Sequence, residues 1–494
     1  MSAISAYARA RAVDAGRAFP IATRRHVHLA ERPLVFVPLA MAGEANAPLA
    51  AMLGTDATKP TLLVVPQPRN RDLRFAFAAE LAALVLNYIR SCTQRVEMSG
   101  NDRVFSDAPQ LLVPNPAGVG FVKLLGRSTR FRRTTGPYPV PAQVPMLGRW
   151  LTHLAERADH PGSSALLAMT SALGLHWASG QSALEDANLA ALLGWISPPD
   201  GVTGFAAAIA AEDPLIWPPA GPSTDPTFDN EVLAPAIRAY DKAAPDSPQR
   251  IRAFARLERD LHSQFEPTWR LMWRAIDTLR ELPVAAGVEA RWTSDRRDFT
   301  NYHDYLTSDG RRQARHDGAV TAARRLQRLE REQATYDATR ALDDPLVMAN
   351  YRITGEAFEG TVVEVDRDRR IVSDKGRRVT RPLIVVRTGD PVDLASGTTL
   401  QAPSHPKQTA TIVELRRETD AAYVTLQLQG GMGSSAVPPP GSVPELDEDT
   451  TYTSAYPEGF RTPELPPIDQ TPWTHGGPPQ PYVPTDDDAQ EVWE

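Results

Sequence analysis

Two clusters of basic side chains carry the residue types and spacing that most clearly suggest chemistry. Arginine presents planar donors that match phosphate oxygens, and nearby hydroxyl or aromatic side chains add hydrogen bonds and stacking. The first cluster contains no acidic residue, and its members are Lys123, Arg127, Arg130, Arg132 and Arg133. The second is interrupted by two aspartates, and its members are Arg367, Arg369, Arg370, Lys375, Arg377, Arg378 and Arg381. Both clusters predict contact with nucleic acid.

Arginine is abundant along the whole chain. The basic clusters can therefore also be interpreted as ordinary solvent-exposed charge with no ligand. A third basic group lies on a predicted helix and comprises Arg311, Arg312, Arg315, Arg324, Arg325, Arg328 and Arg331. Runs of charge commonly only solvate a surface. The region of the second basic cluster is also poor in aromatic residues that could stack on bases, with Tyr351, Phe358 and Tyr423 alone. A protein-interaction role without nucleic-acid contact therefore stays open.

The charge of the chain is unevenly distributed between a body and a C-terminal tail. Residues 437–494 hold twelve acidic residues and one arginine, a net charge of −11, whereas the whole chain carries −7. Residues 1–436 are therefore mildly basic, at +4. An acidic tail on a basic body is typical of a docking segment or of a polyanion mimic that competes for the same surface.

Signatures of catalysis are mostly missing from the sequence. It contains no Walker loop, no nucleophile elbow and no His-Glu-x-x-His pattern. The glycine-rich segment 430–434 follows a predicted strand, but no helix follows it to hold a phosphate. His26 and His28 share one face of an extended segment and could form half of a metal site, but no third ligand can be assigned. We expect no metal and no cofactor.

One polar and aromatic cluster could line a site if the protein is an enzyme. It lies in the segment 292–305 and contains Trp292, Asp295, Arg296, Arg297, Asp298, Tyr302, His303, Asp304 and Tyr305. The alternative is a polar connection between helices that is anchored by its aromatic residues. The single cysteine, Cys92, excludes a disulfide framework and is expected to be a small buried side chain on an apolar helix.

Length and composition predict a multidomain α+β protein. A chain of 494 residues exceeds the size at which one hydrophobic core keeps growing, so two or three domains are expected. No apolar run approaches the roughly 20 residues that cross a bilayer, and the first residues lack the apolar core of a signal peptide. These features predict a cytoplasmic protein with no membrane contact, and the Ala/Arg/Pro usage is typical of a GC-rich bacterial gene.

Residues 1–145 read as an α/β domain. Residues 33–40 and 60–66 are short apolar runs that predict buried strands, and residues 44–53 between them look helical. Residues 70–90 show apolar side chains at three- and four-residue spacing and predict a helix. Residues 110–125 suggest two strands around an Asn-Pro-Ala-Gly turn.

The middle of the chain is predicted to be helical. Residues 146–247 are alanine-rich and interrupted by prolines that separate short helices. Residues 248–345 predict two long helices, about 248–282 and 310–341, paired as an antiparallel hairpin with 283–309 as their connection. Pro267 lies inside the first of these helices and is expected to kink it.

Residues 349–433 are predicted to form a small antiparallel β-barrel of about five strands, of the OB or SH3-like type. Alternating polar and apolar residues, many of them β-branched, are separated by turn signals without an intervening helix. Residues 437–494 read as a disordered, acidic, proline-rich tail. A chain that ends near Ser434 is accordingly expected to keep the melting temperature of the whole protein.

The function predicted from these features is a non-enzymatic, nucleic-acid-associated accessory subunit that works with a separately encoded enzyme. The expected partners are nucleic acid, either DNA or RNA, and a protein. The alternative is a protein-interaction scaffold that does not contact nucleic acid. An enzyme of unfamiliar type, with the 292–305 cluster as its site, is the third possibility.

Overall fold

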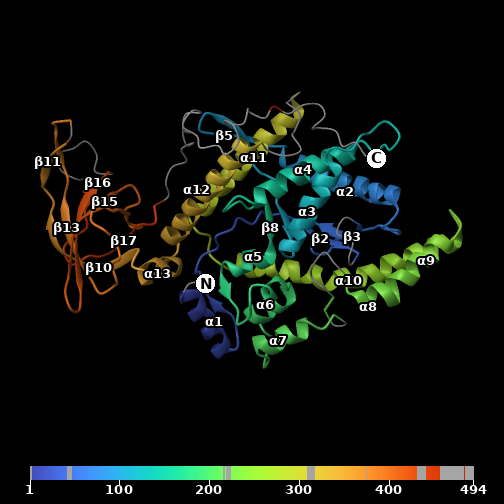
Figure 1. Cartoon of the computed structure of the whole chain (residues 1–494), viewed down its shortest axis with the longest axis horizontal. Coiled ribbons are helices and arrows are strands. Elements are labelled where there is room, and N and C mark those ends of the chain that lie inside the picture. Colours follow the sequence, from blue (N-terminus) through green and yellow to red (C-terminus); the bar gives the residue numbers. More distant parts are fainter. Residues whose placement is uncertain are drawn as a thin grey trace, which may run out of the picture.

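A five-stranded mixed sheet forms the centre of the N-terminal body in the computed structural model (Figure 1). The structure describes residues 3–41, 47–214, 217–218, 224–308, 318–373, 375–430, 441–456 and 483. The strand order is β4 (Thr61–Val64), β3 (Pro48–Gly54), β2 (Leu34–Ala40), β7 (Leu111–Val113) and β8 (Leu166–Ala168). The pairs β4–β3 and β3–β2 are antiparallel, while β2–β7 and β7–β8 are parallel.

Helices cover both faces of this sheet. Along β2, Val35 and Val37 belong to one apolar core together with the long helix α10 (Pro248–Arg280). The alternate residues Leu34 and Phe36 belong to a second core with α2 (Arg71–Cys92), α3 (Pro116–Thr129) and α4 (Gln143–Ala158). Successive side chains of a strand point to opposite faces of the sheet. When helices cover both faces, as in a three-layer α/β/α arrangement, every residue of a central strand is buried and therefore apolar.

The helix expected over 44–53 is replaced by strand β3, so that prediction was wrong for its described residues, 47–53. Alanine, leucine and methionine favour a helix in isolation. Here β3 pairs on both sides, with β2 and β4, and six of its seven residues are buried. Tertiary pairing thus overrides local propensity.

Residues 110–125 contain one strand and one helix, not two strands. Strand β7 ends at Val113, and Asn115 then caps α3 by accepting a hydrogen bond from the Gly118 amide at 3.2 Å. Pro116 occupies the first turn of the helix, where its missing N–H costs nothing. The Asn-Pro pair is therefore a helix start and not a hairpin turn.

The boundary expected at 145 falls inside α4, and the region after it contributes strand β8 to the sheet. Most of this region is helical, as expected. Its remaining elements are α5 (Met169–Gly174), β9 (Trp177–Ala178), η1 (Glu185–Ala187), α6 (Leu189–Ile196), α7 (Gly204–Ala211), α8 (Pro226–Phe228), η2 (Asp229–Leu233) and α9 (Ala234–Lys242). Strand β9 pairs with β1 (Phe19–Pro20), which follows helix α1 (Ala3–Ala15), and β5 (Val96–Ser99) pairs with β6 (Asp102–Phe105).

Four successive helices, and not a two-helix hairpin, lead from the body to the barrel. Helix α10 follows the prediction closely, with Pro267 inside it. The expected connection is itself a helix, α11 (Gly287–Thr307), because its buried residues Trp292 and Phe299 join the second core. Helix α12 (Ala319–Asp343) follows, and α13 (Pro345–Ile353) leads into the barrel. Residues 309–317 lie outside the described part of the chain.

The C-terminal region forms a closed antiparallel barrel at one end of the molecule (Figure 1). Its strand order is β10 (Ala357–Asp366), β13 (Leu383–Thr388), β16 (Ala422–Gln429), β15 (Thr409–Arg417), β14 (Thr399–Gln401) and β17 (Asp449–Thr453), which returns to β10. Alternating residues fill its interior, among them Phe358, Ile384, Val424 and Leu426. A closed antiparallel barrel is thus confirmed, with six strands in place of about five, whereas its OB or SH3-like type stays a prediction.

The sixth strand comes from the segment that was expected to be disordered. Strand β17 pairs with β10 along five residues and also contacts β14, which closes the barrel. Tyr452 is 1% exposed and Thr453 is fully buried. The expectation of an unstructured tail from 437 is therefore wrong for residues 441–456. Its remainder, except residue 483, lies outside the described residues.

Helix α2 is the one helix within the described ranges that is long and apolar enough to cross a membrane. Its residues Phe77, Leu81, Val85 and Ile89 are buried in the second core, which is how a core helix packs. Cys92 at its end is buried, as expected, and burial raises the pKa of its thiol to about 12. The thiol therefore stays protonated at neutral pH.

Candidate nucleic-acid interface

The second basic cluster lies on a two-stranded extension of the barrel. Strands β11 (Arg370–Val372) and β12 (Arg378–Thr380) pair with each other beyond the end of the β10–β13 pair. We call residues 367–381 the arm. In Figure 1 the arm extends from the end of the barrel, at the edge of the molecule farthest from the body. Residue 374 is outside the described set.

One face of the arm is basic and open to solvent. Arg370 pairs with Thr380 across the two strands, and Val372 pairs with Arg378, so these four side chains share a face. Arg370 and Arg378 are exposed, as are Lys375 near the turn and Arg377. No carboxylate in the described part of the chain forms an ion pair with any of these four basic groups.

The other three basic residues of the arm are engaged in contacts, and one of them, Arg369, bonds to a barrel strand. The guanidinium of Arg369 donates to Gln427 Oε1 on β16 at 2.8 Å and to the Arg381 carbonyl at 3.2 Å. Arg381 donates to the Thr380 carbonyl at 3.0 Å. These arginines are half-buried, and so is Ile371 on the same side of the arm. They orient the exposed group but are poorly placed to bind a ligand.

One acidic residue of the predicted tail contacts the arm. Arg367, at the base of the arm, lies 2.9 Å from Glu445, which precedes β17. The Glu445 side chain is 73% exposed, so water screens this pair strongly. The contact places the start of the acidic segment beside the base of the arm.

The first basic cluster lies on α3 and in the loop after it. Its lysine shares an ion-pair partner with an arginine of the third cluster. Lys123 Nζ on α3 lies 3.6 Å from Asp159, and Arg325 on α12 lies 3.3 Å from the same carboxylate. Asp159 therefore neutralises part of the charge of both clusters. Residues 311, 312 and 315 of the third cluster are outside the described ranges.

Aromatic and backbone contacts engage two further members of the first cluster. The guanidinium of Arg130 lies 4.5 Å from the centroid of the Phe131 ring, and that of Arg132 lies 5.4 Å from the Phe75 ring. Arg132 also donates from Nε to the Ser128 carbonyl at 2.8 Å. Arg127 and Arg133 are exposed, whereas Arg130 and Arg132 are half-buried. Much of this cluster therefore packs the loop after α3 against the body.

The two predicted clusters are on separate parts of the molecule. Figure 1 shows α3 among the helices that cover the sheet, whereas β11 lies at the far side of the barrel. Among the described residues, the arm thus has four basic groups without an ion-pair partner, whereas the basic groups of the body cluster are largely engaged.

The 292–305 cluster is part of the body's interior contacts. Asp295 is 3% exposed and accepts hydrogen bonds from Arg157 at 2.9 Å and from the Ser163 hydroxyl and Ser164 amide at 2.7 Å. Trp292 is buried and stacks on His28, with ring centroids 4.0 Å apart. These contacts anchor α11 against α4 and the N-terminal segment, so Trp292 and Asp295 have packing roles, whereas Arg297 and Asp304 of the same cluster are exposed.

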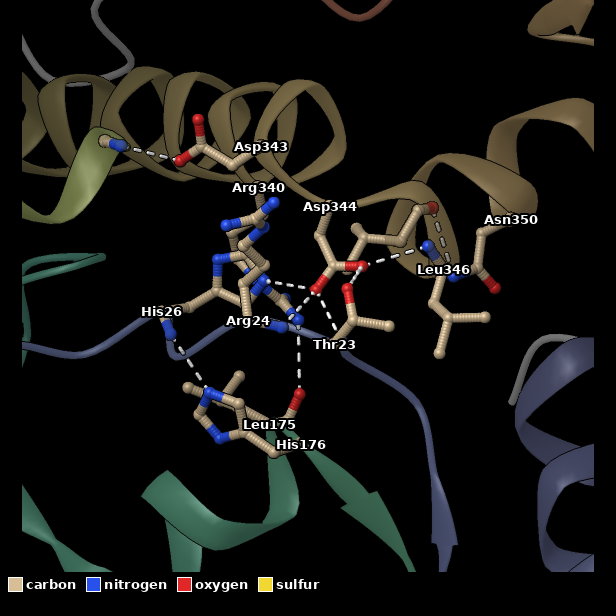
Figure 2. A network of polar contacts seen from close by, with 12 residues as sticks. Thr23, Arg24, His26, Leu175, His176, Arg340, Asp343, Asp344, Leu346 and Asn350 are labelled. Atoms are coloured by element: carbon tan, nitrogen blue, oxygen red, sulfur yellow. Dashed lines mark hydrogen bonds and ion pairs between the residues drawn. The ribbon is translucent and has the colours of Figure 1, made fainter. Parts of the chain in front are cut away.

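The two histidines considered as a metal half-site have different neighbours. His28 stacks on Trp292, whereas His26 Nε2 lies 3.3 Å from Asp344 Oδ2. No group of three or more metal-ligating side chains occurs among the residues that the structure describes. His26 instead belongs to a buried polar network that the sequence analysis did not identify (Figure 2).

Asp344 is the centre of this network, which we call the Asp344 latch. Its carboxylate accepts hydrogen bonds from the Thr23 amide at 2.7 Å and the Arg24 amide at 2.8 Å, and from the Thr23 hydroxyl at 3.0 Å. It also caps α13 through the Leu346 amide at 2.9 Å. Burial opposes its ionisation, but these hydrogen bonds hold the pKa of Asp344 below its usual value.

Both histidines of the latch are neutral and fully buried. His176 Nδ1 donates to the Ala172 carbonyl at 2.7 Å, and its Nε2 accepts from the His26 amide at 3.0 Å. Burial lowers the pKa of His26 and of His176 to about 4. His26 Nδ1 has no hydrogen-bond partner in the described part of the chain. The hydrogen bonds of the latch join residues 23–26, the end of α5 and the start of α13.

A sequence signal for part of the latch was available. Asp344 precedes Pro345, and Asp-Pro is a common start of a helix, with the aspartate as the cap. That signal predicts the start of α13 but not the contacts to residues 23–26, which lie more than 300 positions away.

Comparison with known proteins yields no match for this chain: no protein-family model, curated protein or solved structure corresponds to it. The fold is a three-layer α/β/α body that carries a closed six-stranded β-barrel. Function is therefore inferred from the residues themselves.

Proposed function

We propose that this protein is a cytoplasmic, nucleic-acid-associated accessory subunit that contacts phosphates through the arm of its barrel. One observation carries the proposal, the set of four exposed basic groups on the arm that pair with no carboxylate in the described ranges. They are Arg370, Lys375, Arg377 and Arg378. Basic groups in this arrangement release condensed counterions when they contact phosphates, and that release drives binding.

The shape and composition of the arm favour a duplex over a single strand. A two-stranded β-ribbon fits the major groove of B-form DNA, which is about 12 Å wide. Single-strand binders instead rely on aromatic side chains that stack on bases. The arm carries Ile371, Val372 and Val379 between its basic residues and no aromatic residue. We therefore expect phosphate contacts to a duplex with weak sequence selectivity.

The test is reversal of two charges on the open face of the arm, R370E together with R378E, in the full chain. We expect binding to a labelled duplex at low salt to weaken at least tenfold, equally for unrelated sequences. The dependence of log K on log salt should flatten by about two, since each phosphate contact contributes roughly 0.9 to that slope. Fluorescence anisotropy over a salt series measures both quantities.

The matched control is R256E together with R259E, which makes the same change in net charge on exposed positions of α10. Equal weakening in the two double variants would mean that only the overall charge matters and would overturn the role of the arm. Failure of the unmodified protein to bind duplex or single-stranded probes at low salt would favour the scaffold interpretation. R127E adds a direct test of the α3 cluster, from which we expect a smaller effect.

A further inference from the structure

A cleft of about 680 Å³ lies along one face of α10, on the body and away from the arm. Its floor is formed by residues of α10 from Trp269 onward and by Glu281 directly after the helix, a length of about 18 Å at the helical rise. Arg17, β9 and the end of α6 form its walls. The volume is within the range of about 300–1,000 Å³ that is usual for small-molecule sites.

Three indole rings line this cleft. Trp269 is 4% exposed and its Nε1 donates to the Ala57 carbonyl at 2.9 Å, which fixes the ring. Trp273 meets it edge to face, with ring centroids 5.9 Å apart, and remains half-buried. Trp177 is half-buried in the opposite wall. Flat aromatic surfaces held in place by packing favour a planar, aromatic part of a ligand.

Three arginines lie beside the indoles. Arg274 is held by a hydrogen bond from its guanidinium to the Ser197 carbonyl at 2.7 Å, and Arg270 pairs with Glu266. Arg17 is exposed, and no carboxylate of the described residues pairs with it. The Arg17 guanidinium lines the same cleft as two other arginines. Such a group favours binding of an anionic part of a ligand, for example a phosphate.

The end of the cleft toward the C-terminus of α10 is acidic. Asp277 lies in the last turn of α10 and Glu281 directly follows the helix, with Thr278 between them in the chain. Asp277 is 72% exposed and 3.8 Å from Arg280, so its oxygens remain accessible. In dinucleotide-binding folds, an acidic side chain of this kind accepts a hydrogen bond from the ribose 2′-hydroxyl.

We propose that this cleft binds a ribonucleoside phosphate. The base stacks on the indoles of Trp177 and Trp273, the phosphate contacts Arg17, and a ribose hydroxyl donates to Asp277. The order of groups along α10, with indoles and arginines at one end and carboxylates at the other, matches the separate parts of such a ligand. No residue of the arm takes part, so this site is independent of the proposed function.

The experiment is isothermal titration of the full chain with AMP, dAMP and adenosine. We expect AMP to bind more tightly than either of the other two. R17Q should weaken AMP binding roughly tenfold, the effect of one charge-assisted hydrogen bond, and leave adenosine binding unchanged. D277N should remove the preference for AMP over dAMP. R259Q, on an exposed face of α10 outside the cleft, is the control variant.

Three results would overturn the site. The first is the absence of detectable heat when millimolar AMP is added. The second is equal affinity of the unmodified protein for AMP and adenosine. The third is equal affinity of the R17Q and R259Q variants for AMP. Equal affinity of the unmodified protein for AMP and dAMP would overturn the ribose contact, and with it the assignment of a ribonucleotide. Arg17 and Asp277 are exposed, so these substitutions should leave folding intact, which circular dichroism verifies.

Discussion

At the scale of single residues, Asp344 connects segments that are distant in the chain. Its carboxylate is fully buried and accepts hydrogen bonds from residues 23 and 24, from His26 and from the first turn of α13. A buried anion is tolerated only when hydrogen bonds replace its hydration. The latch therefore specifies where the N-terminal segment meets the helix that leads into the barrel.

We expect D344N to lower the free energy of unfolding by about 3 kcal/mol. Asparagine keeps the size of the side chain but loses the charge and one of the two acceptor oxygens, so buried donors lose their partner. Urea denaturation followed by circular dichroism measures the change. E330Q, an exposed neutralisation on α12, is the control and should change the free energy of unfolding by less than about 0.5 kcal/mol. Similar values for both variants would show that the latch adds no stability.

At the scale of secondary-structure elements, β17 determines whether the barrel closes. It hydrogen-bonds to β10 along its length and reaches β14 at Thr453. Its buried Tyr452 packs against Phe358, with ring centroids 6.1 Å apart. Without β17 both neighbouring strands would become open edges, and open edges promote association between chains.

A chain that ends after residue 440 should lose cooperative unfolding of the barrel and should associate. A chain that ends after residue 456 retains β17 and should keep the melting temperature of the full protein. Differential scanning calorimetry and light scattering compare the two. This reverses the expectation that a chain ending near Ser434 is intact. Equal melting temperatures for the chains ending at 440 and 456 would mean that β17 is dispensable.

At the scale of the whole molecule, the barrel and the body have separate apolar cores. The barrel core is self-contained, and a small cluster that includes Ala22, Ala338, Val347 and Ala455 lies at the junction. The Asp344 latch is beside this junction (Figure 2). The arm is thus placed at a distance from the body, where a long nucleic acid could reach it without contacting the sheet or its helices.

Buried neutral histidines should make the protein sensitive to acid. Burial lowers the pKa of His26, His28 and His176 to about 4, below the value of about 6.5 in an unfolded chain. Between pH 6.5 and 4 the unfolded state binds more protons, so stability is complete above pH 6.5 and falls as the pH drops through this range. Each fully buried histidine accounts for up to about 3 kcal/mol.

Urea denaturation at several pH values tests this. H26Q should make the loss of stability between pH 6.5 and 4 shallower, because one group that gains a proton on unfolding is gone. H262Q, which alters an exposed histidine on α10, should keep the full slope. Identical slopes for the two variants would contradict the assignment of acid sensitivity to the buried histidine.

Several elements could be predicted from sequence because their signals are local. Helices α2 and α10 show continuous apolar stripes and good caps, at Asn70 and Ser247. Strand β2 is apolar throughout, and the barrel strands alternate as their half-buried positions require. The cluster of basic residues on the arm is local as well, since one hairpin carries it.

Other features depended on residues far apart in the chain and required the tertiary structure. Strand β3 looked helical because its partners, β2 and β4, decide its conformation. Strand β17 looked disordered because five residues in a proline-rich, acidic segment carry too little apolar surface to indicate folding until β10 and β14 flank them. The Asp344 latch and the cleft on α10 combine segments 150 or more positions apart. Local propensity depends only on residues that are near in sequence. Strand pairing and burial depend on contacts between distant residues, and these contacts form only in the folded chain.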